Sequence, residues 1–173
     1  MKTTDVTERT LEKEKKDYIF LCEIMEVGFI FIIIICIAMM IINIGSFIAS
    51  IKEYDMPYAV IALIVNEIIL FSGAITSNFA SKIFKKLKDG ETPFRYEIAD
   101  KMKAIGISIC CGTLIAHILE FVIMILTKVD VIGESTPDIM NFSLYTLFGV
   151  ISVIIAYIFN YGCKLQKESD ETL

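Results

Sequence analysis

Four apolar stretches separated by short polar segments constrain this chain more than any other feature of its sequence. They cover residues 27–50, 57–80, 104–127 and 139–162. A helix needs about 20 mostly apolar residues to cross a bilayer, because each residue advances it by about 1.5 Å. Backbone polar groups find no water in the hydrocarbon core, so such segments must be helical. The sequence therefore predicts an all-α membrane protein, an antiparallel bundle of four transmembrane helices.

The polar remainder of the chain is divided into pieces too short for a separate soluble domain. Within 173 residues we predict a cytoplasmic N-terminal segment (1–22), a membrane domain (23–163) and an acidic cytoplasmic tail (164–173). Residues 81–103 of the membrane domain are expected to form a cytoplasmic helical hairpin. The first apolar stretch exceeds the roughly 7–15 apolar residues of a signal peptide, so we expect it to be a retained anchor.

Charge is sorted between the two sides of the predicted membrane domain. Fourteen of the sixteen Lys and Arg residues lie in the N-terminal segment, the central hairpin and the tail. The other two connections hold only Lys52 and Lys128. Because positively charged loops stay in the cytoplasm, we predict a multi-pass protein of the plasma membrane with both termini cytoplasmic.

The central segment contains the clearest local signals for helix ends. Gly90 fits the left-handed position that follows a helix, and Thr92 with Pro93 fits the start of the next one. Its outer face is basic, and together with the acidic tail it is the candidate interaction surface: Lys85, Lys86, Lys88, Arg95, Glu168, Asp170 and Glu171. Such a surface either only attracts anionic lipid headgroups or docks a cytosolic partner.

Three ionisable residues, Glu67, His117 and Glu120, lie deep in the predicted spans. Glu67 and His117 are each about ten residues from the outer end of a span, about 15 Å below the surface. Ionisable groups are costly in a bilayer unless they face the interior and pair. Three interpretations stay open. The cluster is a polar clamp between the second and third helices, a proton or cation site, or a set of side chains with unrelated orientations.

Other chemistry finds little support in the sequence. The five cysteines are expected to act as small apolar packing residues, and His117 with Glu120 supplies only half of one di-iron motif. We therefore predict no catalytic residue, no metal site, no cofactor and no enzymatic activity. Small residues are expected to let the second and third spans approach closely: Ser72, Gly73, Thr76, Ser77 and Ala80 against Gly106, Gly112, Thr113 and Ala116.

Two segments carry a resemblance to a known family. The run FKKLKDGETPFRYEIADKMKAIGI (84–107) and the ending NYGCKLQKESDETL (160–173) resemble a bacterial four-helix membrane protein family, domain of unknown function 2975. The resemblance implies a bacterial inner-membrane protein that works with a small helix-turn-helix regulator of the Cro/repressor type. Glu67, His117 and Glu120 fall on no motif of that family.

These observations leave functional hypotheses from different classes. The first is a regulatory protein that holds or releases a helix-turn-helix regulator and does not itself bind nucleic acid. The second is a small proton- or ion-linked conduit that uses Glu67 and His117, for which four helices would have to assemble into a homo-oligomer. A third is protection against a membrane-active peptide. In each case the lipid bilayer is the surrounding medium.

Overall fold

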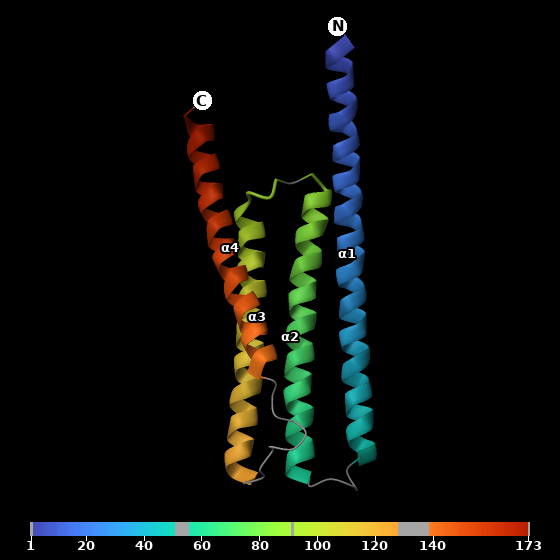
Figure 1. Cartoon of the computed structure of the whole chain (residues 1–173), viewed down its shortest axis with the longest axis vertical. Coiled ribbons are helices and arrows are strands. Elements are labelled where there is room, and N and C mark those ends of the chain that lie inside the picture. The colour runs from blue at the N-terminus through green and yellow to red at the C-terminus, as the bar shows by residue number, and fades with distance from the viewer. Residues whose placement is uncertain (1, 51–55, 91, 128–138, 173) are drawn as a thin grey trace.

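The computed structural model describes residues 2–50, 56–90, 92–127 and 139–172. They form four helices, α1 (Lys2–Ser50), α2 (Met56–Lys88), α3 (Tyr96–Thr127) and α4 (Ile139–Glu171). Each helix contains a stretch long and apolar enough to cross a membrane, which confirms the prediction of four helices of that length and composition. Figure 1 shows consecutive helices running in opposite directions, with both termini at the same end of the molecule. The predicted outer connections lie largely outside the described residues.

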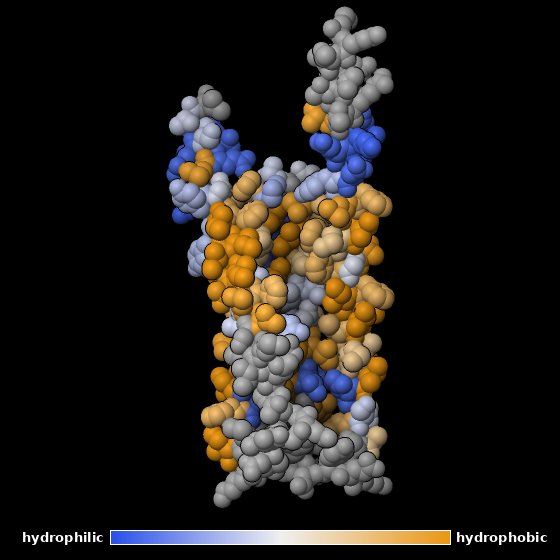
Figure 2. Space-filling view, viewed as in Figure 1, coloured by the Kyte–Doolittle hydropathy of each residue, from blue (hydrophilic) through white to orange (hydrophobic). Residues whose placement is uncertain are grey.

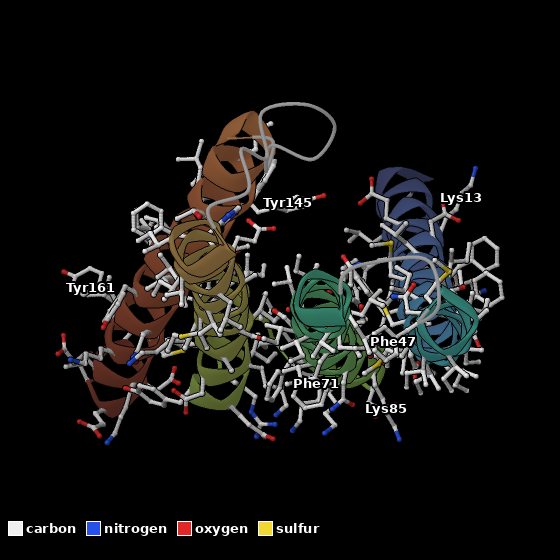
Figure 3. The ribbon with its side chains drawn as sticks, turned by 90° about the horizontal axis from the view of Figure 1, so that it is seen from below. Lys13, Phe47, Phe71, Lys85, Tyr145 and Tyr161 are labelled. Carbon is white, nitrogen blue, oxygen red and sulfur yellow. The ribbon has the colours of Figure 1, made fainter. Side chains whose placement is uncertain are left out.

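The helices pack in the order of the chain. Helix α1 packs against α2, α2 against α3, and α3 against α4. Among the described residues, α1 and α4 do not touch each other, so the helices form an open row instead of a closed ring. Figure 3, which looks along the helices, shows this row.

Two helices continue well past the apolar body. Helix α1 is unbroken over 49 residues, a length of about 74 Å, and includes most of the predicted N-terminal segment. The predicted acidic tail continues α4 as helix to Glu171. Figure 2 shows the resulting division, an orange apolar body with blue hydrophilic side chains on the two projections. We call residues 11–18 the N-terminal arm and residues 164–172 the C-terminal arm.

Helix α1 is attached to α2 through one narrow seam. Between residues 11 and 49, the positions that are not exposed are Ile19, Cys22, Met25, Glu26, Phe29, Ile33, Cys36, Met40, Asn43 and Phe47. Apart from Met25 they recur at alternating steps of three and four, the spacing of a coiled-coil seam. Phe29 stacks on Phe84 of α2 with ring centroids 5.6 Å apart. The rest of the α1 surface is open.

The α3–α4 contact depends on glycine. A Cβ on Gly106 would lie 2.7 Å from the carbonyl oxygen of Gly149, and a Cβ on Gly149 would lie 3.2 Å from the backbone nitrogen of Cys110. The two backbones are therefore in near contact. The prediction that Gly106 faces the second span is wrong. Gly112 does face the second span, because a Cβ on Gly112 would lie 2.5 Å from Ser72 Oγ. Gly106 and Gly112 are six residues apart, which is a rotation of about 240° around the helix, so they face different neighbours.

The central turn confirms one predicted helix end and corrects the next helix start. Helix α2 ends at Lys88, and Gly90 has the left-handed φ of 86°. Helix α3 begins at Tyr96, not at Pro93. The ring of Phe94 stacks on Phe159 of α4 with centroids 5.5 Å apart. This tertiary contact holds the residues before Tyr96 out of the helix.

Candidate functional site

Ion pairs link three helices at the end of the molecule that holds both termini. Lys88 Nζ of α2 lies 2.6 Å from Glu26 Oε2 of α1. Glu97 of α3 pairs with Lys86 of α2, and its Oε1 lies 2.6 Å from Lys101 Nζ on its own helix. These contacts fix the register of the middle of α1 against the last turn of α2, and of that turn against the first turns of α3. We call this set of five residues the paired layer.

The pKa values in the paired layer follow from these contacts. Hydrogen bonds from Lys101 and Lys86 lower the pKa of the Glu97 carboxyl to about 2. The hydrogen bond to Glu26 raises the pKa of Lys88. Both groups lie outside the apolar stretches that span the membrane. Because each shift favours the charged form, Glu97 and Lys88 stay ionised at neutral pH.

The structure divides the predicted interaction surface into separate parts. Lys86 and Lys88 are engaged in the paired layer, whereas Lys85 is exposed and points away from the helix row (Figure 3). Arg95 is also exposed. The acidic residues of the tail lie on the C-terminal arm: Glu168, Asp170 and Glu171.

Hydropathy and residue spacing do not identify the two carboxylates of the paired layer, Glu26 and Glu97. Each acid lies at the same depth as a cluster of lysines on the neighbouring helix. A comparison of depths between neighbouring helices could have identified both acids. Hydropathy cannot supply that comparison, because it does not say which helices are neighbours.

The intramembrane residues are brought together only in part. His117 Nδ1 lies 2.8 Å from Glu120 Oε2 on the same helix, because residues three apart share a helix face. Among the described residues, Glu67 forms no hydrogen bond or ion pair with His117 or Glu120. The Oε1 atom of Glu67 is buried and has no hydrogen-bond partner in the described part of the chain.

Helical phase explains why Glu67 and His117 remain apart. Glu67 lies three heptads before Lys88 and therefore shares the side of α2 that faces α1. His117 lies one heptad after Cys110, whose Sγ packs on Gly149 of α4. The two side chains thus face different neighbouring helices. The predicted clamp between the second and third helices gains no contact from the structure.

Metal and thiol chemistry have little basis in the described residues. These contain no group of three or more His, Cys, Asp or Glu side chains that could hold a metal ion. Cys22, Cys36 and Cys163 are buried, in agreement with the predicted packing role. Cys111 is exposed and Cys110 is half-buried.

Comparison of the chain with protein-family models, curated proteins and solved structures finds no match. The likeness to domain of unknown function 2975 therefore rests on residues 84–107 and 160–173 alone and stays a prediction. The paired layer, the two arms and the buried Glu67 carboxylate are the features that bear on function.

Proposed function

We propose that this chain is a non-enzymatic regulatory protein of the membrane, which binds a cytosolic protein at the end that holds both termini. The observation that carries the proposal is the pair of separate arms beyond the apolar body (Figure 1). Every residue of the N-terminal arm and of the C-terminal arm is exposed. A helix with no tertiary packing is marginal in water at this length. A bound partner would supply the packing that the arms lack.

The orientation of this end toward the cytoplasm belongs to the same proposal. It is supported by the excess of lysine and arginine in the segments that meet there, since such segments are retained in the cytoplasm. On this assignment the paired layer lies just above the cytoplasmic surface of the plasma membrane, in an antiparallel four-span domain. Both arms then extend into the compartment where transcription regulators are found.

The acidic C-terminal arm suggests how a regulator would be held. The arm exposes Glu168, Asp170 and Glu171. DNA-binding domains present a basic face to the phosphate backbone, and an acidic helix offers the complementary charge. A small helix-turn-helix regulator, the partner class that the family resemblance implies, would be kept from DNA while its basic face covers this arm. The chain itself needs no nucleic-acid contact for this role.

The test is crosslinking and recovery of partners from native membranes. The full chain is compared with a chain truncated after Lys164 and with the variant E168Q/D170N/E171Q. The matched control, E12Q/E14Q/D17N, removes three exposed carboxylates from the N-terminal arm. Recovery of a small DNA-binding protein by the full chain and the control only would support the proposal. Equal recovery by all forms, or by none, would contradict it.

A second candidate function is favoured by the buried Glu67 oxygen. A buried carboxylate oxygen without a partner is costly within a bilayer, which makes Glu67 the candidate site for a proton or a cation. Helix α1, which faces it, carries no titratable residue other than Cys36 between residues 27 and 49. On α3 the nearest such groups are His117 and Glu120, which bond to each other. An open row encloses no pore, so conduction would need a homo-oligomer.

Flux assays separate this second function from the first. The wild-type chain in liposomes under a pH gradient should show proton uptake that the Glu67→Gln variant lacks. Glu120→Gln serves as the comparison at a site that already has a partner. Identical leak rates for the wild type and the Glu67→Gln variant would remove the conduit from consideration, and would not affect the arm-binding proposal.

A further inference from the structure

Three lysines near the paired layer have no carboxylate partner among the described residues. Lys82, Lys85 and Lys103 are exposed, and none of them forms an ion pair with any described residue. The exposed Asp100 lies three residues before Lys103 on α3 but does not pair with it. We call these three lysines the interface lysines. Their charge is left uncompensated, in contrast to the charge of Lys86, Lys88 and Lys101.

Aromatic rings hold two of the interface lysines against the apolar body. Lys82 Nζ lies 5.9 Å from the ring centroid of Phe79 on the same helix. Lys103 Nζ lies 5.3 Å from the ring centroid of Tyr157 on α4. A ring face attracts a cation without neutralising its charge. Each ammonium therefore has an ordered position and still lacks a counter-charge from the part of the chain that the structure describes.

The depth of the interface lysines separates them from the paired layer. Lys82 lies six residues before the end of α2, about 9 Å along the helix from Lys88. Helices α1 and α2 run in opposite directions, and Phe84 stacks on Phe29. Lys82, two residues before Phe84, therefore lies at the depth of the exposed Phe31, two residues after Phe29. Glu97 of α3 pairs with Lys86 of α2 and with Lys101 of α3. These pairs align α2 with α3, so Lys103 lies within about one helical turn of the depth of Lys82. Long lysine side chains at such a depth extend toward the headgroups.

We propose that the interface lysines bind the phosphate groups of anionic glycerophospholipids. Lys82 and Lys85 are three residues apart on one face of α2, close enough to share one phosphate, and Lys103 offers a further cation on the adjoining helix. Their depth favours a lipid over a cytosolic protein, because a protein partner would meet the arms and the central turn first. The inference does not depend on the proposed regulatory function.

Native mass spectrometry of the purified full chain tests the proposal. The chain is titrated with phosphatidylglycerol and, separately, with phosphatidylcholine. The variant K82Q/K85Q/K103Q is compared with K13Q/K15Q/K16Q, which removes three exposed lysines from the N-terminal arm. We expect a preference for phosphatidylglycerol that falls by about tenfold or more in the first variant. The control should keep the wild-type preference.

Three outcomes would overturn the proposal. One is unchanged phosphatidylglycerol binding by K82Q/K85Q/K103Q, and another is an equal loss in the control. The third is displacement of the lipid by inorganic phosphate at equal concentration, since the site would then recognise the free ion. If the triple variant fails to fold, the single variant Lys85→Gln is measured instead. Lys85 makes no ion pair or ring contact among the described residues, and its loss should still weaken lipid binding measurably.

Discussion

The two outer helices of the row are attached in different ways. Helix α4 meets α3 backbone to backbone, where Gly106 and Gly149 leave no room for a side chain. Helix α1 meets α2 through side chains, and a Cβ on Gly28 or Gly45 would have nothing within 4 Å. Close-packed backbones cannot shift without losing their contact, whereas interdigitated side chains can adopt other rotamers. We therefore expect α3 and α4 to behave as one rigid unit and α1 as the more mobile element.

The largest predicted effect tests this contrast with matched glycine variants. Gly106→Val places atoms against the Gly149 carbonyl and should lower the free energy of unfolding by about 1–3 kcal/mol, the usual range for overpacking. Gly28→Val is the control in α1, where the added side chain meets open space. Thermal unfolding in detergent measures both. An equal loss in the two variants would break the comparison between the outer helices.

A smaller effect is expected for the ion pair that attaches α1 to α2. The side chains of Glu26 and Lys88 are 13% and 28% exposed, so Glu26→Gln should cost about 1 kcal/mol. A double-mutant cycle with Lys88→Gln isolates the pair itself. The control is Glu12→Gln, since Glu12 pairs with Lys16 within the exposed N-terminal arm. A coupling energy near zero would mean that the side-chain seam alone holds α1.

The smallest effect concerns pH and the link between α2 and α3. The pKa of Glu97 is lowered from 4.5 to about 2, so its contribution to stability is complete above pH 4.5. That contribution should be lost as the pH falls from 4.5 toward 2, because the carboxylate then gains a proton. Thermal unfolding of the wild type against Glu97→Gln across this range measures it. The same pH dependence in both chains would exclude Glu97 as its source.

Hydropathy and spacing predicted the four helices, the Gly90 turn and the His117–Glu120 pair. These features depend on length or on neighbours within one helix, which a sequence states directly. The order of packing was beyond reach, because apolar stretches facing lipid show no strong preferred face. That is why Gly106 was assigned to the wrong neighbour and why Glu26 was not matched with Lys88. The start of α3 at Tyr96 depends on the stacking of Phe94 against Phe159, which is a contact between segments distant in the sequence.

The central claim is that the arms and the paired layer lie in the cytoplasm, where a regulator could bind. Single cysteines at Lys15, Asp89 and Glu168, in a chain whose five native cysteines are replaced, test it with a membrane-impermeant thiol reagent. Ser135→Cys, in a predicted outer connection, is the positive control. The proposed orientation predicts that the three test sites react only after the cells are permeabilised, while the control reacts in intact cells. Labelling of any test site in intact cells would contradict the orientation and the proposed function together.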